Sequence, residues 1–138
     1  MRILLLAALV AAPAAAEDLT VNLESLRVPK GKIVLCLWNS ATKFPDCDAG
    51  QPAQRVTIDA ADADKPVVFK DVPPGVIAVS AFHDENGNGK FDTNFIGLPL
   101  EGTAASNNAK PRMGPPSYKA ASFRFASSTS IRLRFFYL

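Results

Sequence analysis

Lys32-Ile33-Val34-Leu35-Cys36-Leu37-Trp38 is a nearly continuous apolar run. A turn signal precedes it, because residues 27–31 contain Pro29 and Gly31. A short apolar run bounded by turn residues is typical of a strand that is covered on both faces rather than on one. The run therefore predicts a central strand with side chains packed on each side of it for part of its length.

Most of the remaining chain also has the pattern of strands. Residues 19–23 alternate apolar and polar side chains, which is typical of a half-buried strand. Pro73-Pro74-Gly75 is a turn signal, since the prolines remove backbone donors and the glycine permits positive φ. The predicted strands span residues 19–23, 32–38, 55–59, 67–69, 76–83, 122–125 and 130–137. About seven short strands and no convincing amphipathic helix predict an all-β fold, an antiparallel β-sandwich of Ig-like or prealbumin-like architecture.

The N-terminus has the pattern of a secretory signal peptide. Arg2 gives a positive start, residues 3–10 are an unbroken apolar run, and Ala14-Ala15-Ala16 fits the small-residue cleavage pattern. The apolar run is shorter than the ~20 residues that a spanning helix needs, and no later segment is long enough. We therefore expect residues 1–16 to be removed and residues 17–138 to form a single exported domain, periplasmic or secreted, without a membrane span.

The charge balance argues against nucleic acid as a partner. The formal net charge of the chain is +2, and it falls to +1 without Arg2. Arg132 and Arg134 alternate on one predicted strand, where we expect them to line the solvent face. A nearly neutral domain without a basic stripe lacks the electrostatic footprint of a nucleic-acid-binding protein.

Cys36 and Cys47 are the two cysteines of the chain. In an exported protein an even count favours a disulfide, which closes a short loop here and stabilises the fold by ~2–3 kcal/mol. The alternative is two separate thiols, one of them buried in a strand. A metal pair is not expected, because the single histidine, His83, is distant in sequence.

The segment 84–92 has the most specific pattern in the chain. Oxygen-bearing side chains occupy its first, third, fifth and ninth positions, which are Asp84, Asn86, Asn88 and Asp92. Gly89 is the sixth residue, where a calcium loop of the EF-hand type makes its sharp turn, and the Lys90 carbonyl falls at the seventh position. Calcium takes about six to eight oxygen ligands in flexible geometry, and alternate residues of a tight turn direct oxygens at one centre. The spacing therefore predicts a structural calcium ion held by this loop.

The segment departs from the full EF-hand pattern at its twelfth position, which is Phe95 instead of a bidentate glutamate. We expect Glu101 to supply the missing oxygens, because the turn at Gly97-Leu98-Pro99 can bring it back to the loop. Two or three carboxylates favour weak binding, with a Kd of ~10⁻⁴–10⁻³ M as in extracellular modules. The alternative is an Asn-Gly-rich β-turn that binds no metal.

The sequence offers few candidates for catalysis. His83 is the only histidine, so a histidine general base would have to be this residue. Ser80 is three residues away, which places the two side chains on opposite faces of a strand. We expect a structural or loop-packing role for His83 and no enzymatic activity. Trp38, Phe44 and Tyr118 are candidates for a carbohydrate-stacking patch, although core and loop packing is the favoured interpretation because Trp38 ends the most buried strand.

Taken together, several motifs resemble those of one bacterial family. They are Phe69-x-Asp71-Val72-Pro73-Pro74-Gly75, Ala78-Val79, the segment from His83 to Asp92, Gly97-Leu98-Pro99-x-Glu101-Gly102, Ser106-Asn107-Asn108, Pro116-Ser117-Tyr118 and the strand at Phe123. The chain resembles the bacterial domain of unknown function 2141 family from about Leu19 to Tyr137. The resemblance implies a small exported Ig-like domain without an established activity. In its Pro-Pro-Gly strand and its Asp-rich loop the family is similar to carboxypeptidase-regulatory-like and surface-adhesin sandwich modules. It also directs attention to Asp84, Asn86, Asn88, Asp92 and Glu101, and it does not imply the Cys36–Cys47 pair.

Three functions remain open. The favoured one is a non-enzymatic exported module that binds a protein or glycan of the cell envelope through loops stiffened by calcium, with residues 97–116 as the contact surface. The second is a small hydrolase that uses His83 beside the metal loop. The third is a small-ligand carrier with a cavity between the sheets. The lack of a recognisable catalytic constellation favours the first.

Overall fold

The structure is a computed structural model in which residues 7–10 and 15–138 are described. The predicted signal peptide covers residues 1–16, of which residues 1–6 and 11–14 fall outside this description. Within the described part of the chain, no helix is both long enough and apolar enough to cross a membrane.

The described residues form eight strands and almost no helix. The strands are β1 (Glu17–Glu24), β2 (Lys32–Trp38), β3 (Gln54–Asp59), β4 (Val67–Val72), β5 (Gly75–Asp84), β6 (Gly102–Ala105), β7 (Phe123–Phe125) and β8 (Thr129–Arg134). The short helices are the 3₁₀ turns η1 (Ala60–Asp62) and η2 (Ser106–Asn108) and the α-helix α1 (Tyr118–Ala121). The predicted all-β fold is therefore confirmed.

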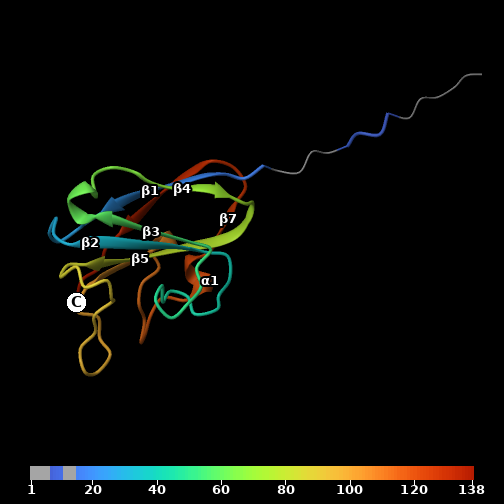
Figure 1. The fold of residues 1–138 in the computed structure, drawn as a ribbon. Helices are drawn as coiled ribbons and strands as arrows, with labels where there is room; N and C mark the ends of the chain where they lie inside the picture. The colour runs from blue at the N-terminus through green and yellow to red at the C-terminus, as the bar shows by residue number, and fades with distance from the viewer. Residues whose placement is uncertain (1–6, 11–14) are drawn as a thin grey trace, which may run out of the picture.

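Two sheets pack against each other, as Figure 1 shows for the layer with β1 and β4 and the layer with β2 and β5. The smaller sheet has the order β4-β1-β8, and the larger has the order β3-β2-β5-β6 with β7 paired to the start of β5. One pair departs from the expected antiparallel pattern, because β1 runs parallel to β8. All other strand pairs are antiparallel.

Strand β2 is the central strand that its apolar run predicts. From Ile33 to Trp38 every side chain is buried. Ile33, Leu35 and Leu37 face the core between the two sheets. The alternate residues Val34, Cys36 and Trp38 belong to a second apolar cluster on the other face of the large sheet, under the loops and α1. A single strand therefore joins two hydrophobic clusters.

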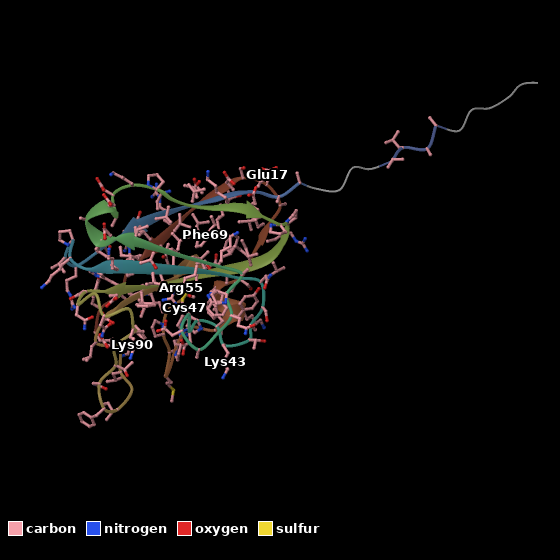
Figure 2. All side chains as sticks on the ribbon, in the orientation of Figure 1. Glu17, Lys43, Cys47, Arg55, Phe69 and Lys90 are labelled. Atoms are coloured by element: carbon pink, nitrogen blue, oxygen red, sulfur yellow. A yellow bond between two sulfur atoms is a disulfide. The ribbon has the colours of Figure 1, made fainter. Side chains whose placement is uncertain are left out.

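The second cluster contains the disulfide, and Figure 2 labels Cys47 within it. Cys36 of β2 is bonded to Cys47 of the following loop, with Cα atoms 6.2 Å apart, which confirms the predicted pairing. The Trp38 ring is buried and packs edge-on against Phe44, which in turn packs against Tyr118. These aromatic residues contribute to packing, which agrees with the favoured interpretation. The disulfide itself is typical of an oxidising, extracellular environment.

Strand β6 was not expected, because its sequence Gly-Thr-Ala-Ala lies inside a segment that reads as irregular loop. It pairs with β5 from Ser80 to His83. At the C-terminus, β8 ends at Arg134, three residues before the predicted end, and Phe136 instead forms an isolated bridge with Thr103. The first difference depends on β5, which pairs with β6, and the second depends on β6, because Thr103 of β6 is the residue that Phe136 bridges.

Candidate metal centre

Three carboxylates lie together at the end of the large sheet. One oxygen from each of Asp84, Asp92 and Glu101 lies within 4.8 Å of the others, so that the group can hold a metal ion. Asp84 and Glu101 are buried, with 1 % and 5 % of their surface exposed, and Asp92 is half-buried. Such a concentration of acidic side chains in a poorly solvated place requires compensation, either by hydrogen bonds or by a cation.

The pairing of two strands positions the first and last of these residues. Asp84 is the final residue of β5, and Glu101 directly precedes β6. Because β5 and β6 are antiparallel and His83 pairs with Gly102, the two acids emerge side by side at the same end of the ladder. Their proximity is therefore a consequence of strand register, even though Glu101 comes 17 positions after Asp84 in the sequence.

A hairpin returns the chain from Asp92 to Glu101. The Leu100 amide donates to the Asp92 carbonyl at 3.0 Å, and Thr93 and Pro99 form an isolated antiparallel bridge. At the turn, the Asn94 side-chain oxygen accepts from two backbone amides, and Gly97 adopts φ of 83°. The turn expected near Gly97 thus exists, and it places Glu101 beside Asp92.

The backbone of the loop curls around the Asp84 carboxylate. The Asn88 amide donates to Asp84 Oδ1 at 3.2 Å, and the Gly89 amide donates to Asp84 Oδ2 at 2.7 Å. Gly87 and Gly89 both have positive φ, at 67° and 79°, a conformation that residues with a Cβ rarely adopt. The glycine at the sixth position of the motif therefore makes the sharp turn that the spacing predicts.

The two asparagines lie beside Asp92, although their nitrogens rather than their oxygens face it. Asn86 Nδ2 donates to Asp92 Oδ2 at 2.7 Å, and Asn88 Nδ2 donates to Oδ1 and Oδ2 at 3.0 and 2.9 Å. The Asn88 donation, followed by that of Asn86, lowers the pKa of Asp92. The Asn88 oxygen accepts from the amide of Lys90, whose own side chain is exposed. The side-chain amides of Asn86 and Asn88 therefore both hold the Asp92 carboxylate.

Glu101 is held by backbone amides at both oxygens. Oε2 accepts from the Glu85 amide at 3.0 Å, and Oε1 accepts from the Asp92 amide at 2.7 Å. Burial raises the pKa of Glu101 to about 7, and the charges of Asp92 and Asp84 act in the same direction. Phe95, the residue at the twelfth position of the motif, is instead fully exposed and takes no part in the cluster.

The base of the loop is fixed by contacts that the sequence does not reveal. Glu85 points away from the carboxylate cluster and forms an ion pair with Arg27, at 2.6 Å. The Arg27 guanidinium also stacks over the Tyr137 ring, 4.4 Å from its centroid. The only indication in the sequence is that Glu85, the second residue of the loop, lies between Asp84 and Asn86, whose side chains are expected to face the centre, so that its own side chain is expected to point away. Nothing in the sequence links Arg27 to Tyr137, because they are 110 residues apart.

A glycine and a phenylalanine complete this support. Gly31 has φ of 79°, and a Cβ at this position would lie 2.1 Å from the Asp84 carbonyl oxygen. On the other side, the Phe91 ring packs against Phe82, with centroids 5.5 Å apart. The loop is therefore tied to the body through backbone contact at its start and through an aromatic contact near its end.

His83 is completely buried below the loop. Its Nδ1 hydrogen bonds to the Tyr137 hydroxyl at 2.8 Å, and its Nε2 hydrogen bonds to the Lys30 carbonyl at 2.7 Å. Both ring nitrogens are therefore occupied by internal partners. Two shallow hollows occur elsewhere on the described surface, one along residues 56–59 and 65–68 and one along residues 107–120, and neither is lined by His83.

Comparison with known proteins adds a family to this description. The model of a family described as "Uncharacterized protein conserved in bacteria (DUF2141)" matches residues 21–132. No curated protein matches the chain, and no solved structure matches it. The matched range includes the loop from Asp84 to Asp92, Glu101, the disulfide and at least part of every strand. Because the match covers most of the sequence, the chain belongs to the bacterial family DUF2141.

Proposed function

We propose that residues 84–101 bind a calcium ion, and that the domain is an exported, non-enzymatic module whose ion-stiffened loop contacts a partner in the cell envelope. The observation that supports this most directly is the convergence of Asp84, Asp92 and Glu101, with one oxygen of each within 4.8 Å of the others. Two of these acids are buried at the ends of paired strands, so the cluster is part of the folded framework.

The chemistry of the donors favours calcium over a transition metal. All candidate ligands are oxygens, and the nearby His83 directs both nitrogens to other partners. Calcium also tolerates irregular geometry, whereas magnesium requires a near-ideal octahedron. Asn86 and Asn88 are exposed, so a half-turn of each amide about its last bond would present oxygen instead of nitrogen to the centre.

Export and the lack of enzymatic activity have separate support. The disulfide and the signal-peptide pattern both favour an oxidising compartment outside the cytoplasm. His83 is buried, both of its ring nitrogens are hydrogen bonded to internal partners, and it lines neither of the two hollows described above, so no observation favours the hydrolase. The partner expected from the sequence is an envelope protein or glycan.

The metal proposal is tested by titrating EDTA-treated protein with calcium while recording backbone amide resonances. We expect shifts confined to residues 84–101, with a Kd of ~10⁻⁴–10⁻³ M and weaker effects for magnesium. Asp92→Asn should weaken binding at least about tenfold, since Asp92 is half-buried and its removal leaves the strands intact. Asp64→Asn is the matched control, because this exposed carboxylate lies outside the loop. Absence of shifts at about 10 mM calcium, or equal binding by both variants, would refute the proposal.

A further inference from the structure

The hairpin that follows the metal loop ends in an exposed apolar tip. Among residues 15–138, nine large apolar side chains are exposed, and four of them lie between residues 95 and 100. Phe95 is 99 % exposed and Ile96 is 64 % exposed, and Leu98 and Leu100 follow them. Residues 93–100 contain no charged side chain. Figure 1 shows this segment extending well beyond the body of the domain. We define these four apolar residues as the tip.

A second projection and a set of basic residues accompany the tip. The segment 109–116 extends in the same direction in Figure 1 and carries the fully exposed Met113. Lys90, Lys110 and Arg112 are exposed, and Figure 2 shows Lys90 between the body and the tip. Three of the acids of the same region are gathered in the carboxylate cluster, and the fourth, Glu85, forms its ion pair with Arg27. The projecting surface therefore combines apolar ends with positive charge.

An exposed apolar patch of this kind marks a contact surface. A glycan is a poor match, because the tip has one aromatic ring and no polar side chain, and Trp38 is buried. A protein partner would need a pocket shaped for a narrow convex hairpin. A lipid surface needs no such pocket, and it favours apolar side chains at the acyl boundary with lysine and arginine at the headgroups.

We propose that the tip inserts into the interface of a bilayer that contains anionic lipids, with Lys90, Lys110 and Arg112 at the headgroups. The inference rests on the proposed function for its calcium dependence. Asp92 and Glu101 stand at the two ends of the hairpin, so an ion bound between them fixes the direction in which the tip points. Calcium therefore increases binding by ordering the loop before it meets the membrane.

The test is flotation of the whole domain with vesicles of phosphatidylethanolamine and phosphatidylglycerol, in calcium and in EDTA, against vesicles of phosphatidylcholine alone. We expect binding to the anionic vesicles that is stronger in calcium. The double variant Phe95→Ser/Ile96→Ser should bind at least about tenfold more weakly, because it removes most of the apolar surface that enters the interface. Val68→Thr/Val76→Thr is the matched control, since these exposed apolar residues lie on β4 and β5 away from the loop.

The outcomes separate this inference from the metal proposal. Calcium binding by the amide titration without any vesicle binding overturns the membrane proposal and leaves the metal site standing. Equal vesicle binding by the tip variant and the control overturns it as well, and tip-dependent binding that is unchanged in EDTA overturns its calcium dependence. Self-association that Phe95→Ser/Ile96→Ser abolishes, without vesicle binding, assigns the tip to a second copy of the chain instead.

Discussion

Calcium should raise the melting temperature of the domain by an amount that follows from the Kd expected for the loop. With three carboxylates and a Kd of ~10⁻⁴–10⁻³ M, 10 mM calcium, taken as about ten to a hundred times Kd, stabilises the folded state by ~1.4–2.7 kcal/mol. Residues 17–138 unfold with an entropy of ~0.26 kcal/mol/K at ~2.1 cal/mol/K per residue. The expected increase is therefore about 5–10 °C.

The assay is a thermal melt followed by circular dichroism, first in EDTA and then in calcium, with each variant compared against itself. With binding about tenfold weaker, Asp92→Asn should reduce the calcium-induced increase to about 2–5 °C, roughly half or less of that of the unchanged protein, because it removes a ligand charge from the centre. Asp64→Asn makes the same change in net charge at an exposed site outside the loop, and it should keep the full increase. An equal increase in both variants would show that calcium acts by general charge screening, and the reasoning from loop geometry would then be wrong.

Three further predictions concern stability. Burial raises the pKa of Glu101 from 4.5 to about 7, so in metal-free protein its contribution to the free energy of unfolding is fully present below pH 4.5 and is lost as the pH rises through 7. The urea concentration at the unfolding midpoint should therefore fall between these pH values, and Glu101→Gln should make the midpoint less dependent on pH. Gly31→Ala should cost at least about 2 kcal/mol in urea unfolding, since it adds a backbone clash to an unfavourable φ, whereas Gly97→Ala, with a similar φ and open space, should cost less. Replacing Cys36 and Cys47 by alanine should lower the free energy of unfolding by about 3 kcal/mol, the chain-entropy value for a separation of 11 residues, and an unchanged midpoint in chemical denaturation would contradict this.

The strands that could be predicted are those with a local apolar pattern that is bounded by turn residues. The bounds of β2 match the apolar run at residues 32–38, because burial on both faces from Ile33 to Trp38 leaves no position for a polar residue after Lys32. The strand at 76–83 becomes β5 with one further residue at each end. In both cases the pattern is local, and turn residues mark where it stops.

Pairings between distant segments could not be read in the same way. The parallel pairing of β1 with β8 depends on which edges remain free after every other strand has paired. Strand β6 has small residues that carry little β preference, and it exists because β5 offers an edge. Tertiary context decides both elements, and a single sequence does not record that context.

In the candidate site, too, the features that depend on local sequence were predicted and those that depend on other contacts were not. The spacing from Asp84 to Asp92 and the turn at Gly97 are local, and they brought the carboxylates, including Glu101, into one prediction. The orientation of the Asn88 amide is not local, since either end of an amide satisfies the same spacing. The contact of Glu85 with Arg27 was missed because Arg27 lies in a turn that has no pattern of its own.

The position of β1 between β4 and β8 has a consequence for how the polypeptide matures. Leu19 and Val21 are fully buried in the finished fold, and Glu17 accepts a hydrogen bond from the backbone amide of Ser128, which lies 111 residues later in the chain. A polypeptide emerging with its N-terminus first keeps one edge of β1 open until the last strand is delivered. The three-stranded sheet is therefore completed only when the C-terminal strand is delivered, after every other strand of the domain is already available for pairing.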